Sequence, residues 1–80
     1  MAGIFRAGQL VTIDERTSST PTTELYSCPG GTEDVRVIGQ LRAKDVALVV
    51  ASWHGGTSIY VIGPMGGGWT FGALLRVVPT

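Results

Sequence analysis

The residue types that most often carry catalytic chemistry are scarce in this chain, which has one histidine and one cysteine. His54 precedes two glycines in an expected hairpin turn, and no acidic residue stands near it in the sequence to orient an imidazole base. Cys28 has no basic neighbour in the sequence that would favour the reactive thiolate. We therefore expect an exposed turn histidine, an incidental cysteine and no enzymatic activity.

Metal and phosphate sites find equally little support. One histidine and one cysteine cannot supply the four ligands of a structural zinc ion. The carboxylates of 14–15 and 33–34 flank a long polar segment and could hold a divalent cation across its base, but solvated loop ends are the commoner arrangement. The glycines at 66–68 are followed by Trp69 rather than by a helix and a lysine, so they indicate a turn and not a phosphate loop. We predict no metal and no cofactor.

Aromatic residues give the strongest functional lead. Trp53, Tyr60, Trp69 and Phe71 all lie in the second half of the chain. Aromatic side chains at a protein surface are typical of contacts with another protein. An alternative interpretation is that Trp69 and Phe71 pack the end of the core, which would leave Trp53, beside a turn, as the main exposed contact. We predict that these four residues form the partner-binding site.

The charge pattern favours a protein partner over a nucleic acid. Six basic and six acidic residues give a net charge of zero, and there is no basic run. Nucleic-acid binding draws most of its affinity from lysine and arginine contacts to phosphates. Arg36, Arg42 and Lys44 form the alternative candidate site, a small basic strip on one strand, but three charges give weak and salt-sensitive binding.

The elements that position these side chains are predicted to be strands between glycine-rich turns. The chain has 80 residues, enough for one domain, and is 44% hydrophobic with 12 glycines. The segment 46–53 is too apolar to alternate, which indicates a strand covered on both faces. The polar segment 16–33 is expected to be a flexible loop, with Leu25 and Tyr26 holding its second half against the core. We expect strands at 9–14, 35–41, 46–53, 58–62 and 75–78, one 3₁₀ turn at 71–74 and no α-helix.

This order of elements resembles the SH3-like barrel. The most specific part is the pair Gly68-Trp69 followed by Leu75-Arg-Val77, an ending similar to that of small SH3-like domains, including uncharacterised phage proteins. The segment 7–13 also looks like the first strand of that class. The resemblance implies an all-β domain over residues 1–80: a five-stranded barrel with a long first loop, closed on itself so that no strand edge is free.

One enzyme family with this fold is also similar in part. The segment 73–76 resembles the stretch that closes the last strand of the type II dihydrofolate reductases. The Gln-Ile-Tyr motif that lines their pore would fall at 66–68, where this chain has only glycines. An enzyme of that kind, or a small-ligand binder, is therefore the least favoured alternative.

These observations favour a non-enzymatic structural or protein-interaction module, such as a small phage or virion accessory protein. A protein partner or self-association into a homo-oligomer is expected, because a neutral chain suits a subunit of an assembly. The longest apolar run, 46–51, is too short to cross a membrane. The single cysteine and the absence of a signal-peptide pattern in residues 1–6 predict an intracellular or virion location and not secretion.

Overall fold

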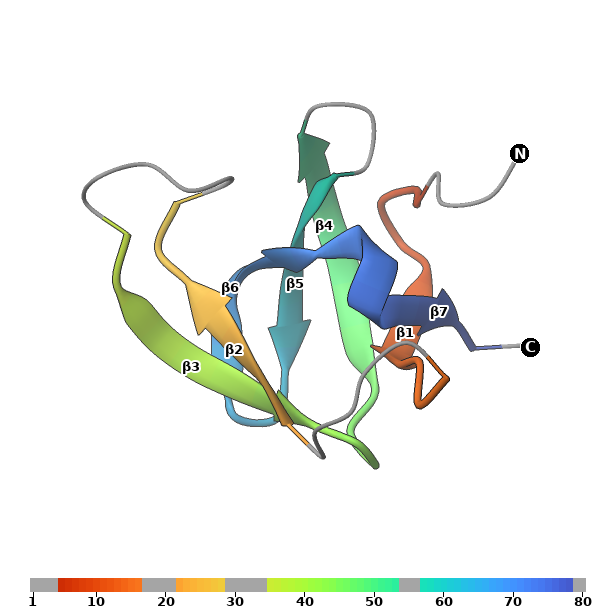
Figure 1. The fold of residues 1–80 in the computed structure, drawn as a ribbon. Helices are drawn as coiled ribbons and strands as arrows, with labels where there is room; N and C mark the ends of the chain where they lie inside the picture. Colours follow the sequence, from red (N-terminus) through yellow and green to blue (C-terminus); the bar gives the residue numbers. More distant parts are fainter. Residues whose placement is uncertain (1–4, 17–21, 29–34, 54–56, 79–80) are drawn as a thin grey trace.

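The fold is a single curled antiparallel sheet. The computed structural model describes residues 5–16, 22–28, 35–53 and 57–78. Within these ranges the strands pair in the order β3-β2-β6-β5-β4-β1-β7, and they curl into a half-barrel (Figure 1). The strands are β1 (Leu10–Ile13), β2 (Thr22–Tyr26), β3 (Val37–Arg42), β4 (Ala47–Trp53), β5 (Ser58–Gly63), β6 (Gly66–Phe71) and β7 (Leu75–Val77), and a 3₁₀ turn at Gly72–Leu74 joins the last two.

The all-β class, the 3₁₀ turn and the five expected strands are confirmed, but the number of strands is wrong. The described residues form seven strands. One addition, β2, lies inside the segment 16–33 that was expected to be a loop. The other, β6, runs through the glycines at 66–68 that were expected to be a turn. β2 lies between β3 and β6, and the pairing of Tyr26 with Trp69, which are far apart in the chain, joins the two additional strands.

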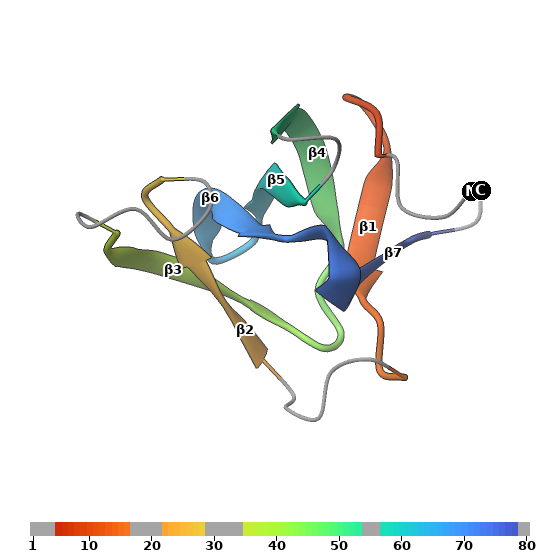
Figure 2. The same ribbon diagram turned by 45° about the horizontal axis from the view of Figure 1, so that its top comes forward.

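The expected closure of the sheet is also wrong for the strands that the structure describes. β3 and β7 stand at the two ends of the strand order, and no pairing joins them. Figure 2 shows the two strands on opposite sides of the open half-barrel. Among the described strands, β3 and β7 therefore each pair on one side only, and the longer of the two is the six-residue strand β3.

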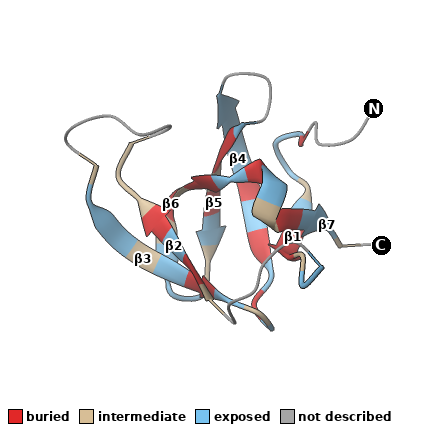
Figure 3. Cartoon of the chain, viewed as in Figure 1, coloured by how far each residue is buried: buried red, intermediate tan, exposed pale blue. Residues whose placement is uncertain are grey.

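The buried residues recur along the strands of this curled sheet (Figure 3) and form one core cluster. Because side chains alternate along a strand, the inward positions of β1, of β5 and of β4 up to Val49 hold mainly branched aliphatic residues or alanine. The β4–β5 register shifts between Val49 and Ala51, and this bulge reverses the faces of β4 beyond it. Leu25 of β2 is fully buried, as expected of a residue that holds this segment on the core. The complete cluster is Phe5, Val11, Ile13, Leu25, Leu41, Ala47, Val49, Ile59, Val61 and Leu75.

The faces of β4 and β3 differ from what their sequences indicate. β4 is covered on one face only, because Ala47 and Val49 are buried while Leu48 and Val50 are 41% and 43% exposed. In β3, uninterrupted alternation would put Val37 on the same face as Leu41, yet Val37 is 56% exposed and Leu41 is fully buried. The β2–β3 register shifts between Leu25 and Tyr26, and such a bulge reverses the faces beyond it.

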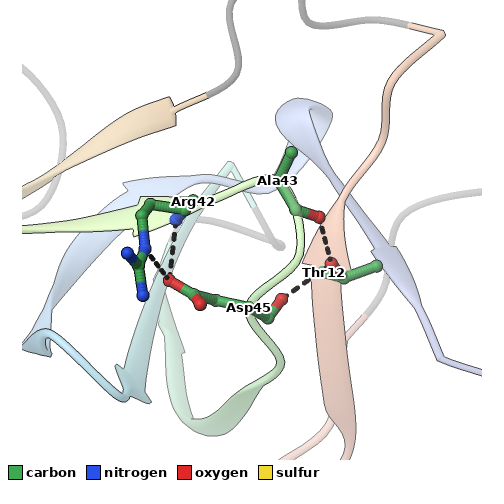
Figure 4. Close-up of polar contacts among 4 residues, drawn as sticks. All are labelled: Thr12, Arg42, Ala43 and Asp45. Atoms are coloured by element: carbon green, nitrogen blue, oxygen red, sulfur yellow. Dashed lines mark hydrogen bonds and ion pairs between the residues drawn. The ribbon is translucent and has the colours of Figure 1, made fainter.

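The β3–β4 turn is fixed by Asp45, whose contacts are drawn in Figure 4. The Arg42 N–H donates to Asp45 Oδ2 at 3.0 Å, the Asp45 N–H donates to the Arg42 carbonyl at 2.9 Å, and the Arg42 guanidinium lies 3.3 Å from the same carboxylate oxygen. Thr12 of β1 donates its hydroxyl to the Asp45 carbonyl at 2.8 Å, which ties the turn to the sheet. The hydrogen bond from the Arg42 N–H, more than the guanidinium, lowers the pKa of Asp45.

This turn predicts a pH-dependent difference between the natural chain and Asp45→Asn. A carboxylate whose pKa is depressed on folding stabilises the fold above its ordinary pKa, and this contribution is lost as the pH falls through the depressed value. We expect Asp45→Asn to be less stable at neutral pH and the difference to shrink as the pH falls below the ordinary aspartate pKa of about 3.9. Urea unfolding across this range tests the prediction, and a difference that does not change with pH contradicts it.

Candidate interaction surface

The convex face of the sheet gathers aromatic side chains from four strands. Ile59 and Val61 of β5 point into the core, so Ser58 and Tyr60 point outward. In the ladder Tyr60 is paired with Trp69 of β6, which is paired with Tyr26 of β2. Ser58 lies between Trp53 of β4 and Phe71 of β6. The outer aromatic face, as we name it, comprises Tyr26, Trp53, Tyr60, Trp69 and Phe71.

Ring contacts join these residues into pairs. The Tyr60 and Trp69 rings meet edge to face, with centroids 5.4 Å apart and an interplanar angle of 78°. The Tyr26 and Phe71 rings lie 6.1 Å apart at 60°. Edge-on and tilted pairs at these distances are favourable, and they hold the rings in place. The rings still reach solvent, since Trp53 is 44% and Phe71 is 42% exposed while the other three are half-buried.

Tyr26 also carries a polar contact at the margin of this face. Its hydroxyl donates to Glu24 Oε2 at 3.3 Å. Burial of the phenol, followed by the nearby Glu24 carboxylate, raises the pKa of Tyr26 above its ordinary value. The phenol is therefore neutral at physiological pH, and Glu24 supplies a negative charge beside the aromatic residues.

Ser58 is a buried hydroxyl in the middle of this apolar surface. The residue is 1% exposed, and its Oγ has no hydrogen-bond partner among the residues that the structure describes. Trp53 and Phe71 are its cross-strand neighbours on either side. A buried hydroxyl without a partner costs about 1–3 kcal/mol of desolvation. Ser58 thus places an unpartnered hydroxyl between two exposed aromatic residues on the neighbouring strands.

The glycines of β6 let the neighbouring strands approach this surface closely. A Cβ on Gly68 would lie 2.7 Å from Leu25 Cβ and 3.1 Å from the Tyr26 carbonyl oxygen. A Cβ on Gly67 would lie 3.2 Å from the Tyr60 hydroxyl, so that phenol extends over Gly67. The glycine triplet therefore serves packing between β2, β5 and β6.

A row of aliphatic side chains extends the apolar surface towards β1. Leu10 of β1 pairs with Leu48 of β4, which pairs with Ile62 of β5. Their exposed fractions are 40%, 41% and 50%. Ile62 is two residues from Tyr60 on the same strand and therefore faces the same side. Exposed apolar area of this extent on a small chain is typical of an interaction surface.

The structure brings the predicted partner-binding residues onto one face. Tyr60, Trp69 and Phe71 lie on adjacent strands, and Trp53 joins them across Ser58. The alternative that Trp69 and Phe71 pack the end of the core is not what the structure shows, because both point away from it. Sequence reasoning missed Tyr26, whose place on this face follows from its alternation with the buried Leu25 once β2 is recognised.

The alternative basic site is not assembled as one strip. Arg36 precedes β3, whereas Arg42 ends it and Lys44 lies in the following turn. Six strand residues separate the two ends by about 20 Å. Arg42 and Lys44 line a hollow of about 400 Å³, but the Arg42 guanidinium is paired with Asp45.

Of the remaining candidates for chemistry, the structure describes Cys28 and the carboxylates of 14–15. Ser27 Oγ donates to Cys28 Sγ at 3.8 Å, and Cys28 is half-buried. His54 and the carboxylates of 33–34 lie outside the described residues. No group of three potential metal ligands occurs in the part of the chain that the structure covers.

Comparisons with known proteins do not assign a function to this surface. Within the described ranges, no helix is long and apolar enough to pass through a membrane. No protein-family model, no curated protein and no solved structure matches this chain.

Proposed function

We propose that this chain is a non-enzymatic protein-interaction module that binds its partner through the outer aromatic face. The observation that carries the proposal is the convergence of five aromatic residues from β2, β4, β5 and β6 on one face. Aromatic residues dominate the energetically important positions of protein interfaces, because they bury a large area with few rotatable bonds. The setting that we propose is an assembly such as a virion, which the resemblance of the sequence to SH3-like domains of phage proteins supports.

The surroundings of the face favour a peptide or protein partner over a nucleic acid. None of the described outward-facing residues of β2, β4, β5 and β6 is basic, and Glu24 adds a negative charge at the margin. A polyanion would be repelled there and would gain no counterion release. An apolar or aromatic peptide segment fits this face better. A segment that also carries a hydrogen-bonding group can pair with the Ser58 hydroxyl when Trp53 or Phe71 moves aside.

Selection from a random peptide library tests this proposal directly. The full chain is immobilised and panned, and the selected peptides are titrated while tryptophan emission is recorded. Trp53 and Trp69 both belong to the outer aromatic face, so binding is expected to shift their emission. Selected peptides that bind without changing this signal, and equally well to Phe71→Ala, would place the interaction elsewhere.

Ser58 gives a prediction that separates stability from binding. Ser58→Ala removes the unpartnered buried hydroxyl and is expected to raise the free energy of unfolding by about 1 kcal/mol. The same change is expected to weaken peptide binding, because it removes the hydroxyl that we propose pairs with the peptide. Residues kept for function can commonly be replaced with a gain in stability. Urea unfolding and peptide titration measure the two effects on one protein.

The matched control for this prediction is Thr70→Val. The Thr70 hydroxyl lies 3.5 Å from that of Thr23, so this buried hydroxyl has a partner. Its removal is expected to give no gain in stability, since it leaves Thr23 unpaired. A Ser58→Ala protein less stable than the natural chain would contradict the account of this residue.

A further inference from the structure

A hollow beside β3 brings a carboxylate next to the outer aromatic face. The hollow has a volume of about 340 Å³, and its lining residues are Glu24, Val37, Gly39, Gln40 and Met65. Glu24 Oε2 accepts the Tyr26 hydroxyl at 3.3 Å, and Val37 is the partner of Tyr26 in the β2–β3 ladder. The hollow therefore adjoins the outer aromatic face at Tyr26.

Glu24 has no basic partner among the residues that the structure describes. All six lysine and arginine residues of the chain lie within the described ranges. The ion pairs found there join Arg16 to Asp14 and Arg42 to Asp45. The Glu24 side chain is exposed and accepts a hydrogen bond from the Tyr26 hydroxyl, which leaves further acceptor positions on its two oxygens. A cation from another molecule can therefore pair with this carboxylate without displacing one of the described basic side chains.

The surroundings of Glu24 suit a cation on an apolar stem. The faces of aromatic rings attract cations, and the Tyr26 ring lies beside the carboxylate with the Phe71 ring 6.1 Å away and tilted by 60°. Val37 and Met65 are 56% and 46% exposed and give the hollow apolar walls, against which methylene groups can pack. Carboxylate, aromatic ring and apolar wall are thus found within one small region.

We propose that the peptide segment bound by the outer aromatic face carries an arginine whose guanidinium pairs with Glu24 and stacks on the Tyr26 ring. This inference rests on the proposed function, since it assigns the chemistry of one subsite of that face. A planar guanidinium can stack on a ring while its in-plane N–H groups donate to a carboxylate, whereas a lysine ammonium is compact and more strongly hydrated. Gln40, which is opposite Glu24 in the ladder, can accept a further N–H at its side-chain carbonyl.

Titration with the amide of N-acetyl-arginine tests the subsite by itself. Nuclear magnetic resonance of the labelled full chain is expected to show saturable changes at Tyr26, Val37 and Met65. The amide of N-acetyl-citrulline has nearly the same shape without the charge, and it is expected to bind at least tenfold more weakly. No saturable change with the arginine compound, or equal binding of the two compounds, would overturn the subsite.

A matched pair of variants tests whether Glu24 supplies the charge. Glu24→Gln keeps an acceptor for the Tyr26 hydroxyl and is expected to bind the arginine amide at least tenfold more weakly. Glu15→Gln removes the same charge from an exposed residue outside the hollow and is expected to bind as the natural chain does. Equal affinities of these two variants would show that the overall charge of the chain, and not Glu24, attracts the ligand.

Library-selected peptides distinguish failure of this inference from failure of the proposed function. Replacing the arginine of a selected peptide with citrulline is expected to weaken its binding at least tenfold to the natural chain and no more than twofold to Glu24→Gln. Peptides that lose binding to Phe71→Ala but bind Glu24→Gln as well as the natural chain overturn the arginine subsite and leave the proposed function standing. Peptides that bind Phe71→Ala equally well overturn the proposed function, and the titration with the arginine amide then decides the subsite alone.

Discussion

Replacing Gly68 with alanine is expected to lower the free energy of unfolding by about 1–3 kcal/mol, because it forces a methyl group into a space that is already filled. The new Cβ would lie 2.7 Å from Leu25 Cβ and 3.1 Å from the Tyr26 carbonyl oxygen, and neither atom can move without shifting β2. In a chain of this size, the melting temperature is expected to fall by roughly 4–8 °C for each kcal/mol lost. Urea unfolding gives the free energy, and a thermal scan gives the shift.

Gly39→Ala is the matched comparison for this change. A Cβ on Gly39 would lie 3.3 Å from the Met65 carbonyl oxygen and 3.5 Å from Leu25 Cδ1, which are smaller overlaps than at Gly68. The added Cβ also lowers the entropy of the unfolded chain, which is worth about 0.4–1 kcal/mol in favour of folding. We therefore expect a much smaller loss for Gly39→Ala. A Gly68→Ala protein as stable as Gly39→Ala would show that β2 and β6 do not approach as described.

The second large effect concerns binding. Loss of an aromatic residue at the centre of an interface typically costs about 2 kcal/mol or more, which corresponds to about a 30-fold weaker complex. We expect this loss for Trp69→Ala, because Trp69 lies between Tyr60 and Tyr26 at the centre of the outer aromatic face. Titration with a library-selected peptide measures the affinity, and a thermal scan of the same sample shows whether the fold is kept.

Two further variants separate the loss of this face from a general loss of exposed apolar area. Phe71 and Val77 are both 42% exposed, but only Phe71 belongs to the outer aromatic face. Phe71→Ala is expected to weaken peptide binding about tenfold or more, and Val77→Ala to leave it unchanged. Equal effects of the two changes would mean that exposed apolar area in general, and not this face, binds the peptide.

The sequence predicted the strands whose own residue types favour a strand and whose ends are marked by turn residues. β1, β5 and β7 carry β-branched residues bounded by turn signals, and their predicted ends lie within one or two residues of the observed ones. β4 is predicted as a strand, but its outward-facing residues are also apolar, so the sequence wrongly indicated that both of its faces are covered. An apolar residue that serves an interaction surface cannot be told from a core residue by hydropathy alone.

The pattern missed the strands whose conformation depends on distant partners. β2 begins in a run of threonines that is typical of a loop, and β6 begins with three glycines that carry no side-chain pattern at all. Their pairing, Tyr26 with Trp69, joins residues far apart in the chain, and strand formation depends strongly on such context. Tyr26 was not predicted with the aromatic residues of β4, β5 and β6, because its place on their face depends on this unrecognised pairing.

The measurement that tests the central claim most directly is the mapping of a bound, library-selected peptide by nuclear magnetic resonance of the labelled chain. If the outer aromatic face is the binding site, the ring signals of Tyr26, Tyr60, Trp69 and Phe71 and the indole of Trp53 show the largest changes on titration. Changes confined to the β3–β4 turn around Arg42 and Lys44, with the aromatic signals unmoved, would contradict it.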